Sequence, residues 1–266
     1  MANRKPTRHS TRSRERAPMK LAAQVSGRDN PTLVWTENTM TTEASSCGVG
    51  LTLAHPVQPG RLLQLELPLP STLRAFAYFK PNYQVWGLVR FIRDNPPDET
   101  GATRFSLGLA FAGQHPPRSY EQDPTTLYEL RPTRDRNGLW VVREKPRYGS
   151  RYQRATEERY PVEATVRVEL FNERGMVVQQ DICQTSNVSS FGSAVQTKLK
   201  APQGRFVRLT ELASGTSLLT LTRACRSLGD GLHSLHLEFM NGAWPETSLP
   251  FLHSAPALTR AEFSYF

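Results

Sequence analysis

The chain has 266 residues, of which 38% are hydrophobic and 20 are proline, and its formal net charge is +9. This length suffices for two domains that each bury a core of their own. No run of about 18 apolar residues occurs, which excludes a membrane-spanning helix. The basic N-terminus lacks the apolar segment of a signal peptide, so a cytoplasmic protein is expected.

The positive charge is concentrated at the N-terminus. Seven lysines and arginines stand within the first twenty residues, against one acidic residue, Glu15. The rest of the chain is close to neutral, which argues against a broad basic face for nucleic acid. Residues 1–18 show no apolar periodicity and are expected to form a flexible basic arm. A salt-sensitive contact between this arm and nucleic acid stays open as a weaker possibility.

The first half of the chain predicts a β-barrel over residues 19–113. Short strands are expected at 19–25 and 32–36, and residues 63–67 alternate apolar with polar as a half-buried strand does. Residues 105–111 alternate Phe and Leu with Ser, Gly and Ala, so one face fits only small side chains. Residues 85–92 are apolar on both faces, with Val85, Val89 and Phe91 on one and Trp86, Leu88 and Ile92 on the other.

Residues 114–150 are proline-rich and predict a linker. Asp123 before Pro124 favours a short helix from that point to about Leu130, and residues 140–142 predict an isolated strand or a docking contact.

Residues 151–242 repeat the strand pattern as a second barrel, with turns at 172–175 and 229–231. This copy is about sixteen residues shorter, and the extra length of the first is expected around 71–82. Residues 243–266 form a C-terminal tail.

A six-residue segment occurs twice, as Glu43-Ala-Ser-Ser-Cys-Gly48 and as Asn187-Val-Ser-Ser-Phe-Gly192. Upstream of each lies an Arg-x-Pro, at Arg16 and Arg159, and downstream a Gly-Arg, at 60–61 and 204–205. The shared offset of about 144 residues indicates an internal duplication. Short strands, frequent turn residues and little helical periodicity predict an all-β fold of two tandem small antiparallel β-barrels.

No familiar catalytic motif is present. The sequence lacks the nucleophile elbow, the phosphate-binding loop, the dinucleotide fingerprint and the zinc-protease helix. Its histidines are scattered, and its three cysteines (Cys47, Cys183 and Cys225) have no metal-binding spacing, so free thiols are expected. We therefore expect no enzyme, no metal and no cofactor.

The paired arginines and the repeated segment together resemble the PilZ domain family, which binds the bacterial second messenger cyclic di-GMP through Arg-x-x-x-Arg and (Asp/Asn)-x-Ser-x-x-Gly. Residues 12–16 match the first element in full, and residues 187–192 match the second. The resemblance covers most of the chain as two PilZ-like copies and implies a cyclic di-GMP receptor with a protein partner. The ligand-binding residues it implies are Arg12, Arg16, Glu43, Ser45, Gly48, Arg154, Arg159, Asn187, Ser189 and Gly192.

The chemistry of these residue types fits such a ligand. Arginine can clamp phosphate with two hydrogen bonds, donate to guanine O6 and N7, and stack on a purine. Asn or Asp can pair with the N1/N2 edge of guanine, and a serine hydroxyl adds a further bond. Glycine permits a close approach that a Cβ would block.

Each copy departs from the family pattern at one place. Glu43 stands where the family has Asp or Asn, and Arg154 and Arg159 are separated by four residues instead of three. If one barrel binds, the first is narrowly favoured. The departures leave open a degenerate PilZ-type module that binds protein partners and no nucleotide, with the motifs serving as turn caps.

Overall fold

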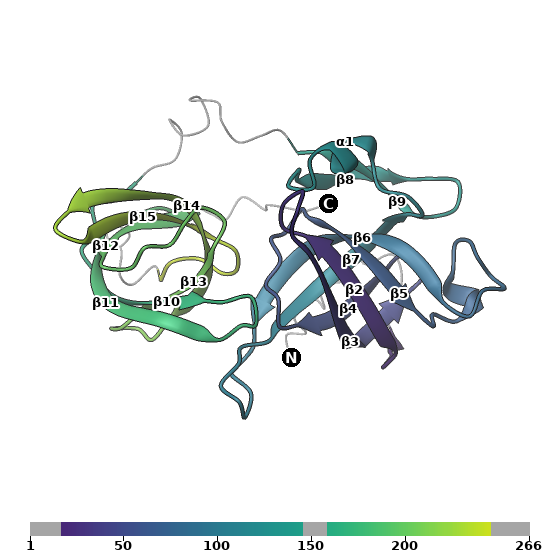
Figure 1. Cartoon of the computed structure of the whole chain (residues 1–266), viewed down its shortest axis with the longest axis horizontal. Coiled ribbons are helices and arrows are strands. Elements are labelled where there is room, and N and C mark those ends of the chain that lie inside the picture. The colour runs from purple at the N-terminus through teal and green to yellow at the C-terminus, as the bar shows by residue number, and fades with distance from the viewer. Residues whose placement is uncertain (1–16, 146–158, 246–266) are drawn as a thin grey trace, which may run out of the picture.

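The computed structural model describes residues 17–145 and 159–245, which form two β-barrels side by side (Figure 1). The predicted all-β fold of two tandem small antiparallel barrels is confirmed. Residues 1–16 of the expected arm, and most of the expected tail, lie outside the described residues. The described helices are the 3-10 turn η1 (Ser71–Leu73) and the short helix α1 (Arg118–Gln122).

The first barrel closes in the order β3-β2-β5-β6-β7-β4, because β4 pairs back with β3, and β1 adds to β3 from outside. Its strands are β1 (Ala17–Pro18), β2 (Ala22–Arg28), β3 (Val34–Ser45), β4 (Gly48–Leu53), β5 (Leu62–Leu67), β6 (Tyr83–Asp94) and β7 (Phe105–Gly113).

The second barrel has the same connectivity, closing in the order β10-β11-β12-β15-β14-β13. The shared strand order is what an internal duplication produces, and β3 and β11 are irregular at equivalent positions, after Thr41 and Thr185. The strands are β10 (Thr165–Phe171), β11 (Val177–Val188), β12 (Gly192–Thr197), β13 (Phe206–Glu211), β14 (Ser217–Gly229) and β15 (Leu232–Phe239).

A β-bulge in β6 changes the faces that its last residues reach. Val89 and Ile92 both lie in the core, whereas Phe91 is on the outside and 40% exposed. The expectation that Phe91 shares a face with Val85 and Val89 is therefore wrong. The extra residue at the bulge, Arg90, shifts the period-two alternation by one, and a sequence pattern does not reveal such an insertion.

The extra length of the first barrel is divided between two loops. The β5–β6 loop, residues 68–82, corresponds to residues 212–216 between β13 and β14. The β6–β7 loop, residues 95–104, corresponds to the two-residue turn at 230–231. The expectation that the whole difference falls around 71–82 is thus correct only for the larger part.

The linker region holds a short helix, but not where the sequence pattern put it. Helix α1 ends before Asp123, whose backbone N–H donates to Ser119 O (2.8 Å) and whose carboxylate accepts the Thr125 N–H (2.9 Å). Asp123 therefore closes one helix instead of opening another. The strands β8 (Tyr128–Arg134) and β9 (Trp140–Glu144) then form a hairpin, and Tyr128 of this hairpin and Tyr120 of α1 cover the outer face of β6.

The barrels share an apolar interface, which explains why β14 is buried on both faces. Its inner face lies in the second core, while Leu219 and Leu221 join the core cluster of the first barrel. Phe171 meets Phe105 edge-on, with ring centroids 5.6 Å apart. The interface therefore continues the hydrophobic core from one barrel to the other.

Arg208 of β13 is the polar centre of this interface. Its guanidinium donates to Asp94 of β6 (3.0 Å) and to Thr103 (2.9 Å), and it lies 3.5 Å from Glu169 of its own barrel. The same group lies 4.9 Å from the ring centroid of Phe171. Arg208 thus links two barrels through a charge that is only 13% exposed and has partners on both sides.

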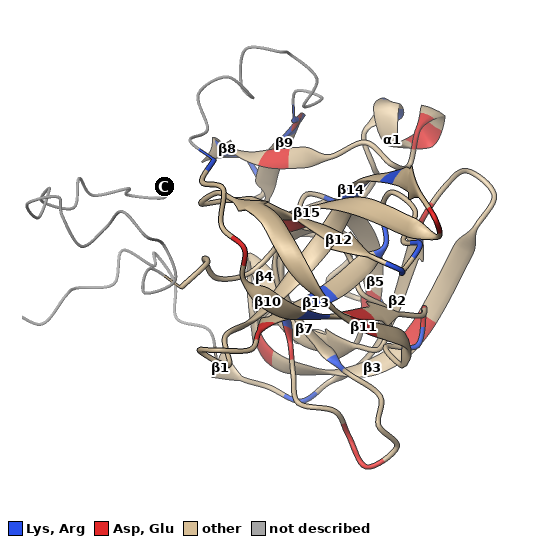
Figure 2. Cartoon of the chain, turned by 90° about the vertical axis from the view of Figure 1, so that its left-hand side faces the viewer, with Lys and Arg blue, Asp and Glu red and all other residues tan. Residues whose placement is uncertain are grey.

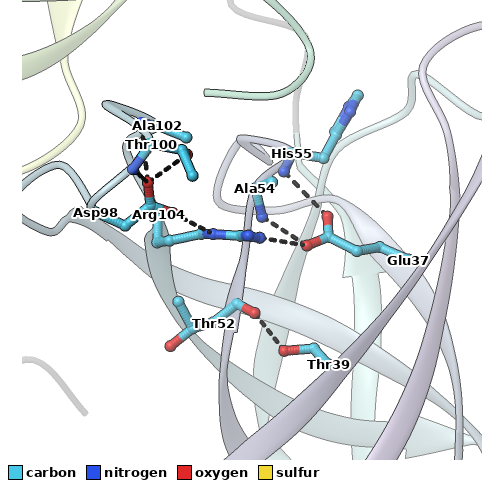
Figure 3. Close-up of polar contacts among 9 residues, drawn as sticks. All are labelled: Glu37, Thr39, Thr52, Ala54, His55, Asp98, Thr100, Ala102 and Arg104. Carbon is cyan, nitrogen blue, oxygen red and sulfur yellow. Dashed lines mark hydrogen bonds and ion pairs between the residues drawn. The ribbon is translucent and has the colours of Figure 1, made fainter. Parts of the chain in front are cut away.

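Carboxylates fix the loops of the first barrel that meet the second. Glu37 accepts the backbone N–H groups of Ala54 (2.7 Å) and His55 (3.1 Å) and pairs with Arg104, while Asp98 accepts bonds within its own turn (Figure 3). Next to them, the Thr103 N–H donates to Gly175 O (2.8 Å). The loops therefore present a fixed surface to the β10–β11 turn.

We expect the replacement of Thr222 by valine to stabilise the protein by about 1 kcal/mol. Thr222 is buried in the second barrel, and its hydroxyl has no hydrogen-bond partner within residues 17–145 and 159–245. The equivalent residue of the first barrel is already a valine, Val89, because Thr222 and Val89 stand opposite equivalent leucines of β15 and β7. Urea unfolding measures the change.

The matched control is Thr220→Val on the same strand. Thr220 is equally buried, but its hydroxyl donates to the carbonyl of Val207 (2.8 Å). This replacement removes a bond and leaves an acceptor without its partner, so a loss of about 1 kcal/mol is expected. Shifts of the same sign in both variants would contradict the argument.

Candidate ligand-binding site

The serines of the two repeated segments make the same contacts. Ser45 Oγ donates to Gly48 O and Ser189 Oγ to Gly192 O, both at 3.2 Å. The same hydroxyls accept the N–H two residues on, from Cys47 (3.4 Å) and Phe191 (3.3 Å). Both serines are buried, with 3% and 6% of their surface exposed. Each hydroxyl therefore shapes the turn that carries the segment.

The glycines of the segments also have equivalent surroundings. A Cβ on Gly48 would overlap the carbonyl oxygen of Leu109, and one on Gly192 would overlap that of Leu237. Only a residue without a side chain lets β4 and β12 approach β7 and β15 this closely. The Ser-x-x-Gly pattern is thus explained by local geometry in both barrels.

The segment that follows each predicted arginine enters its barrel beside the repeated segment. Ala17 and Pro18 pair with Ala44 and Glu43, and Tyr160 pairs with Val188. Arg159 is exposed, while Arg12, Arg16 and Arg154 lie outside the described residues. The described residues that directly follow Arg16 and Arg159 therefore lie beside Glu43 and next to Asn187.

A threonine that the motif comparison missed fixes this entry in both barrels. Thr41 donates to Met19 O and accepts the Leu21 N–H (2.9 Å). Thr185 makes the equivalent bonds, to Val162 O and from the Ala164 N–H (2.9 Å). Both are buried and stand at the offset of about 144 residues. Extending the repeat alignment two residues upstream of Glu43 and Asn187 would have revealed them.

A row of residues crosses the outside of the first barrel next to Glu43. Strand register places Glu43 opposite Gly50, Gly50 opposite Gly108, and Gly108 opposite Phe91. The Glu43 side chain lies over Gly50, with its Cγ 2.9 Å from where a Cβ would be, and the Phe91 ring lies against Gly108. The equivalent row of the second barrel is Asn187, Ala194, His236 and Ala224.

The repeated Gly-Arg pairs lie at the opposite ends of the barrels. Arg61 donates to Arg28 O, and Arg205 to Phe171 O (2.8 Å), so each arginine caps the end of the first full strand of its barrel. Both line a cleft of about 680 Å³ between the barrels, together with Asp29 and Glu173. Of the predicted ligand-binding residues that the structure describes, none lines this cleft.

The cleft carries charges of both signs. Arg205 pairs with Glu173, and His55 lies 3.1 Å from Asp29. Burial by itself raises the pKa of Asp29, but hydrogen bonds and charge from His55 and a bond from Trp35 leave that pKa below its usual value. Since Arg205 already pairs with Glu173 and a second carboxylate, Asp29, lines the same cleft, the cleft is less suited to a doubly charged anion than an open basic site would be.

The described residues also bear on metals, thiols and membranes. No three His, Cys, Asp or Glu side chains in the two described ranges could jointly hold a metal ion. All three cysteines are free, as expected, and burial raises the pKa of Cys183 to about 11. Within the same ranges, no helix has the length and apolar character to cross a membrane. Lys and Arg are interspersed with Asp and Glu over the second barrel (Figure 2).

No protein-family model and no curated protein matches the chain. Among solved structures, the inhibitor of motility MotI/DgrA of Bacillus subtilis is 10% identical, with a TM-score of 0.27 over 84% of this chain and 88% of that one. PlzA of Borreliella burgdorferi in complex with c-di-GMP is 9% identical, with a TM-score of 0.24 over 88% and 84%. YcgR of Escherichia coli in complex with c-di-GMP is 7% identical, with a TM-score of 0.26 over 83% and 76%. These values are too low to assign a family or a ligand.

Proposed function

We propose that the chain is a bacterial, non-catalytic receptor of the PilZ type, which binds cyclic di-GMP in the cytoplasm and passes the signal to a protein partner. The observation that carries the proposal is the pairing of Pro18 with Glu43 and of Tyr160 with Val188, which neighbours Asn187, because each pairing comes one or two residues after a predicted arginine. Two distant parts of the sequence thereby meet at one place. Guanidinium groups and a carboxylate or amide at one place suit a ligand with phosphates and guanines.

In this proposal the first barrel is the main site. Arg12 and Arg16 clamp phosphate and guanine, while the Glu43 carboxylate accepts the N1 and N2 hydrogens of a guanine. Ser45 and Gly48 act through the turn that positions Glu43, because their polar and backbone groups are already engaged. In the second barrel, Arg154, Arg159 and Asn187 have the corresponding roles, with Ser189 and Gly192 shaping the turn. Binding orders the arginine arm, which offsets part of the affinity.

Calorimetric titration of the full chain with cyclic di-GMP tests the proposal. We expect binding, and an Arg16→Ala variant is expected to bind at least about tenfold more weakly because a charge-assisted bond is lost. Arg159→Ala is expected to have a smaller effect. Arg143→Ala, which removes an exposed arginine of the hairpin paired with Glu129, is the matched control. The absence of both heat and a melting shift at high micromolar ligand would rule the proposal out.

The second candidate is a degenerate PilZ-type module that binds protein partners and no nucleotide. It is favoured by the complete structural use of Ser45, Gly48, Ser189 and Gly192, which accounts for the repeated motif without any ligand. It predicts that partner binding survives when Arg12, Arg16, Arg154 and Arg159 are all replaced by alanine. A co-purification or titration with the identified partner decides, and loss of binding would contradict this candidate.

A further inference from the structure

We propose that Phe91 is the stacking platform for a guanine base whose edge is held by Glu43, and that the first barrel alone has this platform. The inference rests on the proposed function, since it names a further contact of the same ligand. It starts from the outer row of Glu43, Gly50, Gly108 and Phe91, which strand register fixes across β3, β4, β7 and β6.

The two central residues of the row, Gly50 and Gly108, let the side chains of Glu43 and Phe91 pack directly against the sheet backbone. A Cβ on Gly108 would overlap the Phe91 ring, and a Cβ on Gly50 would stand 2.9 Å from Glu43 Cγ. Because Gly50 and Gly108 are paired on neighbouring strands, about 5 Å apart, the carboxylate and the ring are next neighbours on the surface. An acceptor for a base edge thus lies beside an aromatic surface for a base face.

Phe91 is an aromatic residue on the outer, solvent-facing side of the first barrel. It is 40% exposed, although the core would accept an apolar side chain, because the β6 bulge directs it outward. The exposed Arg93 guanidinium lies over the ring, 5.6 Å from its centroid, so a base that stacks on this face displaces it and keeps the cation at its edge. Stacking and a nearby cation are the two features that nucleotide-binding surfaces combine.

The second barrel has other residues at the equivalent positions of this row. The position of Gly108 is taken by His236, that of Gly50 by Ala194, and that of Phe91 by Ala224. A β-carbon therefore stands where the first barrel has only backbone, and the flanking aromatic ring is absent from the row. The exposed aromatic residue of the second site, Phe191, instead belongs to the turn itself. The row thus gives the two barrels unequal capacity to hold a base.

Titration with cyclic di-GMP of the full chain and of single variants tests the platform. Phe91→Leu keeps apolar cover over Gly108 but lacks a π face, so affinity is expected to fall about 10- to 100-fold. Phe91→Trp retains the face, so affinity is expected to be kept, with the added indole fluorescence quenched on binding. The matched control is Phe79→Leu, which removes a fully exposed ring from the β5–β6 loop and is expected to leave the affinity unchanged, and Phe191→Ala reports on the second site.

The outcomes separate the two levels of the proposal. If the unaltered chain binds and Phe91→Leu binds equally well, the platform is wrong while the receptor stands. A loss of affinity in Phe191→Ala but not in Phe91→Leu would move the site to the second barrel and also overturn the inference. No binding by the unaltered chain would overturn both. Melting curves of each variant check that the fold is kept.

Discussion

Replacing Arg208 by alanine is expected to destabilise the protein by about 3–5 kcal/mol and to loosen the two barrels from each other. The side chains of Arg208 and Asp94 are only 13% and 16% exposed, and Glu169 also depends on this guanidinium. The substitution leaves both carboxylates without this cation in a region that is largely shielded from water. It also removes the group that stacks on Phe171 and the bond to Thr103.

Urea unfolding of the full chain, followed by tryptophan fluorescence and by circular dichroism, measures the effect. We expect one shared transition in the unaltered protein and a lower midpoint in Arg208→Ala. Arg143→Ala is the control, because Arg143 is 59% exposed in its ion pair with Glu129 and such pairs contribute less than about 1 kcal/mol. Equal losses in the two variants would show that Arg208 does not link the barrels.

Gly175→Ala is expected to cost roughly 2–3 kcal/mol more than Gly138→Ala. Both glycines have a left-handed backbone, with φ of +71° and +83°, so alanine is strained to a similar degree at either position. Only Gly175 is in contact with the other barrel. A Cβ there would overlap Thr103 O and stand 3.2 Å from Ala54 O, whereas nothing lies within 4 Å of a Cβ on Gly138.

The difference between these two variants isolates the contact between the barrels from backbone strain. Unfolding free energies give the overall cost, and hydrogen exchange at the Thr103 amide reports the bond to Gly175 O directly. We expect faster exchange at Thr103 in Gly175→Ala and unchanged exchange in Gly138→Ala. Identical free-energy losses with unchanged exchange would mean that the loops adjust and that the barrels are not held at this point.

The strands were predictable wherever one face meets the core and the other meets solvent. Residues 105–111 and 164–170 alternate strictly, and the structure has β7 and β10 there. The prediction failed where local chemistry was ambiguous. The Asp123-Pro124 pair fits the start of a helix in isolation, but packing of Tyr120 and Tyr128 onto β6 favours a helix that ends at this point.

The sequence predicted the repeated motif residues of the candidate site but not the residues that strand pairing brings next to them. The repeat identified Ser45 and Gly48 with their counterparts Ser189 and Gly192, because equal turns require equal residues. Phe91 carried no such signal, since the bulge that turns it outward inserts a residue without changing the composition of the strand. Its place beside Glu43 depends on pairing between β3, β4, β7 and β6, which residue spacing along the chain does not encode.

The amino-acid sequence by itself determined the duplication, the all-β class and the turn residues of both repeats. These depend on local preferences, namely period-two alternation and the backbone demands of Ser and Gly. Tertiary structure alone decided how the barrels meet and what lies beside Glu43. Arg208 finds Asp94 in the other barrel, and Phe91 reaches the row of Glu43 across two intervening strands. Contacts of this kind arise from chain closure and burial, which bring together residues that have no relation in the sequence.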